Sequence, residues 1–191
     1  MNLIDLPATE TLIHAFGEDW AIAHARRLLQ LIEIIAEDQI YDHQAVQWAA
    51  YLHDWGAFRQ YYQAGCDHAA LSRKITESEI LPRVDLSNRT KDLILEAIER
   101  HDYRDQHPTE SVEAPLLREA DFLDFLGVIG IAREFARRLN DLGVSYTQII
   151  VRKDLIENRF TLPKAQVIAQ QRLARMNLFL ADLIEEGFGN L

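Results

Sequence analysis

One dipeptide in the sequence combines two side chains that could bind a metal ion. His53-Asp54 ends the apolar run AAYLHDWG, and both side chains can reach one point just off a helix surface, although neighbouring helix positions diverge by about 100°. Imidazole nitrogens and carboxylate oxygens together suit divalent transition metals. Other candidates stand at or near expected helix ends or on largely apolar faces: His24, His68, His101 and Asp121.

Aspartates on apolar faces need a counter-charge. An unpaired carboxylate moved out of water costs several kcal/mol, so a buried Asp54 or Asp121 requires a cation or hydrogen-bond donors. A second His-Asp dipeptide, His101-Asp102, follows Glu99 and Arg100, and its natural interpretation is a solvated helix end. Only the pair at position 53 is therefore taken as a candidate motif.

Helices are expected to carry all these residues. Apolar residues recur at steps of three and four, and β-branched alternation is almost absent, so we predict an all-α fold with one domain over residues 1–191. Four helices are expected before the polar segment at 102–111. They start at Gly17 or Asp19, Asp42, Asp67 and Ser87, and they end at Ile35, Gly56, Ile80 and His101.

Three further helices are expected in the C-terminal half. Pro115 suits the first turn of a long helix that holds Asp121, whereas Ser145 and Leu162-Pro163 would open two more. Gly127 and Gly130 would allow close helix packing. The longest apolar stretch is far below the ~20 residues that span a bilayer, so we expect a soluble protein without a membrane partner.

Composition excludes some classes of partner. The chain has 191 residues, is 48% hydrophobic and carries a net charge of −10, which opposes binding to a nucleic acid polymer or an anionic membrane. A single cysteine, Cys66, fits the reducing cytoplasm. The start of the chain does not resemble a signal peptide.

The order of the candidate residues resembles the HD-domain superfamily of metal-dependent phosphohydrolases. DWAIAHARRLL is similar to the family's first helix with its ligand at His24, AAYLHDWGAF to its His-Asp pair, and LLREADFLDFLGVIGIAREF to its aspartate-bearing helix with the ligand at Asp121. Asp124 would then be structural. Many relatives have Asp-Ala-Asp where this chain has Glu119-Ala120-Asp121, which leaves the role of position 119 open.

The resemblance implies a metal-dependent phosphoric ester hydrolase. His53 and Asp54 would be catalytic, one or two divalent ions would be bound, and the substrate would be a small phosphate ester, for example a nucleotide. His68 and His101 match extra histidines of binuclear relatives and would bind a second ion or the phosphate. Four basic residues near the proposed ligands in the sequence are candidates for holding the phosphate: Arg59, Arg73, Lys74 and Arg104.

Several alternatives stay open at this point. Mn, Fe, Co, Ni, Zn and Mg are not distinguished by the sequence. A dinuclear iron oxygenase of the same fold would use similar ligands, and a non-catalytic helical sensor or partner-binding domain would also need apolar helix faces. His14, His43 and His107 have no place in the signature and are expected to be surface or structural residues.

Overall fold

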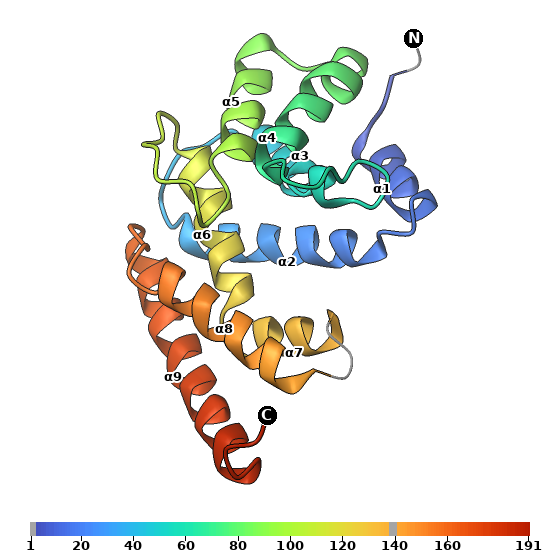
Figure 1. Ribbon diagram of the computed structural model, residues 1–191. Coiled ribbons are helices and arrows are strands. Elements are labelled where there is room, and N and C mark those ends of the chain that lie inside the picture. Colours follow the sequence, from blue (N-terminus) through green and yellow to red (C-terminus); the bar gives the residue numbers. More distant parts are fainter. Residues whose placement is uncertain (1–2, 138–140) are drawn as a thin grey trace. The chain divides into compact units, whose positions relative to one another are not determined.

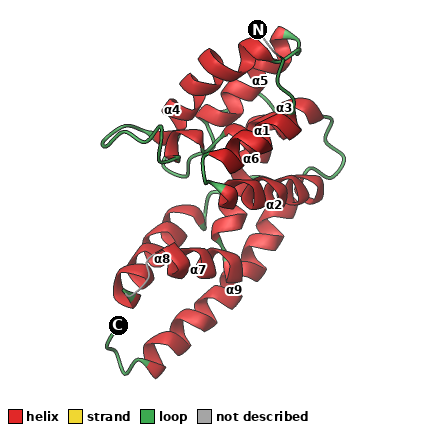
Figure 2. Cartoon of the chain, turned by 90° about the vertical axis from the view of Figure 1, so that its right-hand side faces the viewer, coloured by secondary structure: helices red, strands yellow, loops and turns green. Residues whose placement is uncertain are grey.

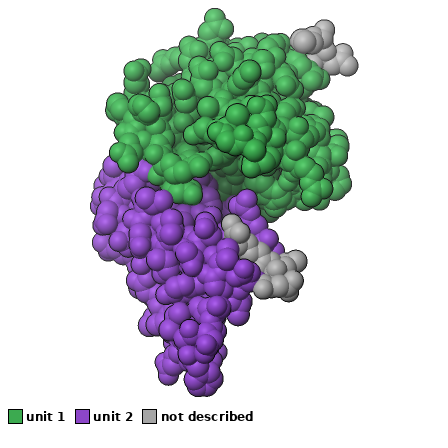
Figure 3. All heavy atoms as spheres, in the orientation of Figure 1, with its two compact units in different colours: residues 1–118 green, residues 119–191 purple. Residues whose placement is uncertain are grey.

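Helices and loops make up the computed structural model, which describes residues 3–137 and 141–191 (Figure 1; Figure 2). No strand occurs in these two ranges, so the predicted all-α fold is confirmed. The chain divides into two compact units, residues 1–118 and 119–191, which are coloured separately in Figure 3. A single domain over residues 1–191 stays a prediction.

Unit 1 holds the N-terminal helices. Its α-helices are α1 (Leu6–Ala15), α2 (Asp19–Ile35), α3 (His43–Leu52), α4 (His68–Ile75) and α5 (Asn88–Glu99). Three short helical segments join them: η1 (Trp55–Ala57), η2 (Thr76–Ile80) and η3 (Leu81–Arg83). Helix α3 packs against α2 and α5, and α4 packs against α5 and η1. This packing buries the apolar positions that the helical periodicity predicted, including Leu28, Leu52 and Ile98.

Side-chain caps fix where three of these helices begin, as the sequence predicted. The backbone N–H of Ala45 donates to Asp42 at 3.1 Å before α3, and that of Thr90 donates to Ser87 at 3.1 Å before α5. Asp67 accepts from the N–H of Ala69 at 2.7 Å, so α4 begins at His68. Such caps satisfy N–H groups that a helix leaves without internal partners.

Unit 2 contains α7 (Gly127–Arg137), α8 (Leu142–Ile156) and α9 (Pro163–Glu186), while α6 (Glu113–Phe125) crosses the boundary between the units. Helix α7 packs against α8 and α9. The expected long helix after Pro115 is divided, because Gly127 adopts a left-handed backbone conformation with φ of +74° that a continuous helix cannot contain.

Other boundaries also differ from those expected. Helix α1 was not predicted. The turns from Thr76 to Ile80 belong to a π-helical segment rather than to α4. Ser145 does not open a helix: it is buried inside α8, whose cap is Asp141, which accepts from the N–H of Val144 at 2.8 Å. None of the described helices is both long enough and apolar enough to cross a membrane.

Candidate metal centre

Two histidines of the candidate site are held in the same way at the ends of helices. His53 directly follows α3, and its Nδ1 lies 2.9 Å from the carbonyl oxygen of Ala50. His101 lies just after α5, and its Nδ1 lies 2.6 Å from the carbonyl oxygen of Ile98. A carbonyl oxygen only accepts, so both Nδ1 atoms carry a hydrogen, and in the neutral rings both Nε2 atoms present a lone pair. Both rings are buried.

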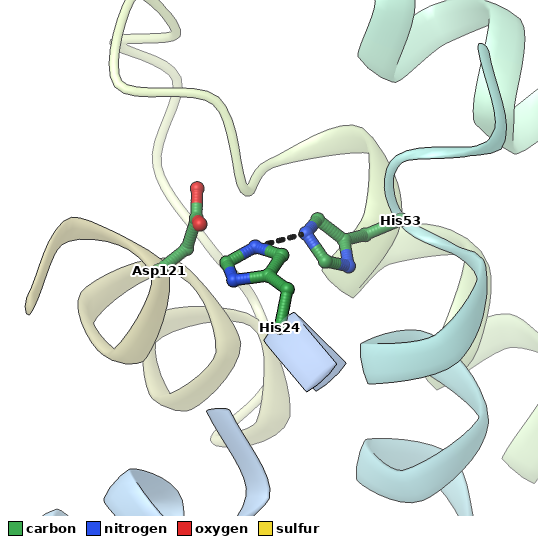
Figure 4. A group of neighbouring side chains, drawn as sticks. All are labelled: His24, His53 and Asp121. Atoms are coloured by element: carbon green, nitrogen blue, oxygen red, sulfur yellow. Dashed lines mark hydrogen bonds between the residues drawn. The ribbon is translucent and has the colours of Figure 1, made fainter. Parts of the chain in front are cut away.

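His24 approaches this pair from α2. Its side chain is buried one turn inside the helix, and its Nε2 lies 3.2 Å from Nε2 of His53 (Figure 4). His68, the first residue of α4, forms the matching contact on the other side, with its Nε2 3.2 Å from Nε2 of His101. The four imidazoles therefore form two pairs, and His53 and His101 link them with ring centroids 4.8 Å apart.

The carboxylate of Asp54 lies between the two pairs. Its Oδ2 is 3.4 Å from Nε2 of His53 and 3.8 Å from Nε2 of His24. Its Oδ1 is 3.5 Å from Nε2 of His68 and 3.8 Å from Nε2 of His101. Each carboxylate oxygen thus faces one pair of imidazoles, and Asp54 is the common member of two groups of ligand atoms.

Electrostatics keep Asp54 ionised. Burial on its own would raise the pKa of its carboxyl group, but the positive charge that the neighbouring rings of His53, His24 and His101 carry when protonated holds this pKa well below the usual value. The carboxylate is 18% exposed, so it is open to solvent, whereas the side chains of His53 and His101 are almost fully buried. A small ligand would therefore meet Asp54 before the two buried rings.

The donor set fits a divalent metal ion. Two ligand atoms about 2.1 Å from one ion lie roughly 3.0 to 3.5 Å apart, which is close to the separations within each group. Nε2 of His53 and Oδ2 of Asp54 are both acceptors, and one hydrogen from His24 can satisfy only one of them. A cation between these atoms removes that conflict. His53, Asp54 and His101 each offer a ligand atom within 4.8 Å of the others.

Asp102 is a member of this site that the sequence interpretation missed. Instead of a solvated helix end, its side chain is buried, and its Oδ2 lies 3.3 Å from Nδ1 of His68. Arg104 donates to the same carboxylate, from Nη2 at 2.6 Å and from Nε at 2.8 Å. Burial would raise the pKa of Asp102, but the hydrogen bonds from Arg104 lower it overall. Its position directly after a histidine, as at Asp54, was the available signal.

Gly56 sets the distance between Asp54 and His68. A Cβ atom on this glycine would lie 2.3 Å from the backbone oxygen of His68 and 2.9 Å from the backbone nitrogen of Ser72. The N–H of Gly56 donates to Oγ of Ser72 at 2.8 Å. Segment η1 therefore packs directly on the first turn of α4. This packing brings His68 next to the carboxylate of Asp54, two residues before Gly56.

The predicted aspartates of α6 lie in unit 2. Asp121 is buried, and so is Asp124 one turn later. Asp124 forms an ion pair with Arg133, which agrees with its expected structural role. Glu119 is also buried and accepts hydrogen bonds from the N–H of Thr161 at 2.8 Å and that of Leu162 at 3.0 Å. The carboxylate at position 119 therefore holds the start of α9.

The basic candidates differ in their surroundings. Arg104 lies beside the histidines, with Nη2 3.1 Å from Nδ1 of His68. Arg73 instead forms ion pairs with Glu77 at 3.0 Å and Glu99 at 3.4 Å. Arg59 and Lys74 have exposed side chains. Arg104 is thus the basic candidate that directly contacts the histidine cluster in the described part of the chain.

The three histidines outside the signature are exposed, as expected. His14 pairs with Asp19, and His107 pairs with Asp105. His43 packs on Tyr41, with ring centroids 4.2 Å apart. All three form local contacts at the surface of unit 1.

Residues 21–126, more than half of the chain, match the model of the HD domain. The chain belongs to the HD-domain family. The matched range includes His24, the His53-Asp54 pair and Asp121, the residues on which the sequence resemblance rested. No curated protein sequence matches this HD-domain chain.

Solved structures share the fold at low sequence identity. A predicted HD superfamily hydrolase from an uncultured Thermotogales bacterium has a TM-score of 0.66 and 22% identity, covering 95% of this chain and 92% of its own. An HD-superfamily hydrolase from Bacillus thuringiensis has a TM-score of 0.64 and 20% identity, with coverages of 93% and 92%. Bacillus subtilis YpgQ, solved in complex with ADP, has a TM-score of 0.63 and 21% identity, with coverages of 89% and 90%.

Proposed function

We propose that this HD-domain protein is a metal-dependent phosphoric ester hydrolase that uses metal-activated water on a small phosphate ester, such as a nucleotide. The observation that carries the proposal is the position of Asp54, whose two oxygens face two pairs of imidazole nitrogens at 3.4 to 3.8 Å. Because the described cluster presents several acceptors to one another, a cation is its natural occupant.

Two ligand groups follow from this arrangement. The first ion would be held by His24, His53 and Asp54. Asp121 joins this group on the family's sequence order. The second would be held by His68 and His101, with Asp54 shared between the two. The candidate metals are Mn, Fe, Co, Ni, Zn and Mg, and the imidazole nitrogens favour the transition metals over Mg.

The residues of the chain would then have distinct tasks. A bound divalent ion lowers the pKa of a water molecule that it binds, and it polarises the phosphoryl oxygen. Asp54, the more exposed of the two residues of the His-Asp pair, would orient the attacking water. His53 would hold its Nε2 lone pair in place through its hydrogen bond to Ala50. No covalent intermediate on the protein is required.

The substrate class is argued from charge and from one neighbour. A chain with a net charge of −10 repels polyanions, so a small anion drawn by ions at one site is a better substrate than a nucleic acid polymer. YpgQ was solved with ADP, a small phosphate ester. Arg104 is the first candidate for contacting the phosphate, followed by Arg59, Arg73 and Lys74. We place this activity in the cytoplasm.

Metal analysis of the purified protein, combined with a screen of small phosphate esters, tests the proposal. The panel would hold nucleoside mono-, di- and triphosphates and p-nitrophenyl phosphate, each assayed with and without chelator. Release of inorganic phosphate that requires bound metal supports the proposal. Bound iron with oxygen consumption and no phosphate release would instead favour the oxygenase, and a metal-free protein would favour a sensor or partner-binding domain.

A further inference from the structure

His68 differs from the other histidines of the cluster in what can hold its ring. His53 and His101 follow helices, so each finds a carbonyl oxygen three residues earlier. His68 is the first residue of α4, and the first turn of a helix offers N–H donors rather than carbonyl acceptors. Its Nδ1 therefore needs a partner from another part of the chain.

The carboxylate of Asp102 is in position to be that partner. Its Oδ1 is fixed by two donors of Arg104, the backbone N–H at 2.6 Å and Nε at 2.8 Å. Its Oδ2 accepts from Nη2 of Arg104 at 2.6 Å and lies 3.3 Å from Nδ1 of His68. Because Oδ1 is fixed and the side chain is buried, Oδ2 cannot turn away from the imidazole.

We infer that Asp102 is a positioning residue for the second ion: it accepts a hydrogen bond from Nδ1 of His68 and thereby leaves the Nε2 lone pair directed toward Asp54. This inference rests on the proposed function, because it concerns the ligand group of His68 and His101. Carboxylates that accept from the second nitrogen of a ligating histidine fix both the tautomer and the ring orientation.

Arg104 competes for the same nitrogen. Its Nη2 lies 3.1 Å from Nδ1 of His68, and a guanidinium can only donate, so this contact fits the opposite tautomer, in which Nε2 carries the hydrogen. Nη2 carries two hydrogens, and one of them donates to Asp102 at the shorter distance of 2.6 Å. Arg104 therefore holds the carboxylate, and the tautomer of His68 shows which of the two contacts prevails at Nδ1.

The substitution Asp102→Asn tests the inference directly. The amide oxygen would keep the bonds of Oδ1 to Arg104, so the NH₂ group would replace Oδ2 and donate to Nδ1 of His68. The tautomer would then reverse, and the affinity for the second ion should fall by about 10- to 100-fold while the first ion stays bound. Asp105→Asn, in the same loop but paired with His107, is the matched control and should keep both ions.

Two measurements are needed. Titration of metal-free protein with Mn²⁺ or Zn²⁺ gives the affinity and stoichiometry for each variant. Long-range proton–nitrogen NMR spectra of the metal-free protein give the tautomer of His68, whose signals are assigned by their loss in His68→Gln. We expect hydrogen on Nδ1 in the wild type and in Asp105→Asn, and on Nε2 in Asp102→Asn.

The NMR spectrum tests the role of Asp102 even if the protein binds one ion or none, so the inference and the proposed function can fail separately. Hydrogen on Nε2 of His68 in the wild type, or unchanged affinity for the second ion in a folded Asp102→Asn variant, would overturn the inference about Asp102. If that variant does not fold, the NMR spectrum of the wild type decides: hydrogen on Nδ1 of His68 supports the inference, and hydrogen on Nε2 overturns it.

Discussion

His53 and His101 are equivalent in their hydrogen bonding although they follow different helices. Each Nδ1 donates to a carbonyl oxygen three residues earlier, at 2.9 Å for His53 and 2.6 Å for His101. Their Nε2 atoms therefore both face the Asp54 carboxylate, one toward each of its oxygens. Asp54 consequently lies between two similar halves of one cluster.

Removing a central ligand should abolish metal binding with little effect on the fold. In His53→Ala and Asp54→Ala we expect both the metal affinity and the rate of hydrolysis to fall. The decrease should exceed the roughly 10- to 100-fold that follows loss of a residue that only hydrogen-bonds to a metal ligand. Metal content by mass spectrometry, phosphate release and circular dichroism measure the three effects. Normal metal content in both variants would refute the assigned site.

Two exposed histidines provide the controls for these variants. His43→Ala and His107→Ala should keep turnover and metal content near those of the wild type, because surface substitutions usually change stability by about 0.5 kcal/mol or less. A large loss of activity in either variant would mean that the ligands are misassigned.

Loss of His68 or His101 should distinguish a second metal site from a phosphate site. If both bind an ion, His68→Ala and His101→Ala each lower the stoichiometry from about two ions to one. If they contact phosphate instead, KM rises while metal content stays the same. We expect the first outcome, because the Nε2 of each ring lies within 3.8 Å of Oδ1 of Asp54.

A methyl group at position 56 should disturb both stability and the site. In Gly56→Ala the new Cβ would clash with the backbone of α4 at His68, which should cost about 1 to 3 kcal/mol and weaken binding of the second ion. Gly65→Ala is the control: its Cβ meets open space, but its φ of +81° should cost roughly 1 kcal/mol. Equal metal binding in the two variants would contradict the role of Gly56.

Glu119 should affect stability and leave metal binding unchanged. Glu119→Gln weakens charge-assisted hydrogen bonds to Thr161 and Leu162, which should lower the free energy of unfolding by about 1 to 3 kcal/mol. Urea denaturation measures this loss, and metal content should equal that of the wild type. A loss of metal without loss of stability would instead assign position 119 to the metal site.

Asp105 should contribute to stability only above acidic pH. Burial raises the pKa of its carboxyl group, but the hydrogen bonds from His107 outweigh this effect and lower the pKa overall. Because the folded pKa is below the unfolded value of about 3.9, the contribution is complete above that pH and is lost as pH falls through the folded pKa. The stability difference between wild type and Asp105→Asn should therefore shrink as the pH falls below about 4, and urea denaturation as a function of pH measures it.

The sequence predicted the local features of the site. Asp42, Asp67 and Ser87 cap their helices as expected, because a cap depends on residues two or three positions apart. The order His24, His53-Asp54, Asp121 was sufficient to indicate the family that residues 21–126 match. The break at Gly127 was missed, because a glycine in an apolar run fits close helix packing as well as a left-handed turn.

Only the tertiary structure showed which of the histidines in unit 1 meet and what holds them. His101-Asp102 has the same two residue types as His53-Asp54, yet Asp102 does not lie between the histidine pairs as Asp54 does. It contacts Nδ1 of His68, a residue of another helix. That contact depends on how α4 packs against α5 and η1, and the close approach at Gly56 controls this packing. Capping is decided within one helical turn, whereas the meeting of distant side chains depends on how several helices pack together, which no local pattern of residues specifies.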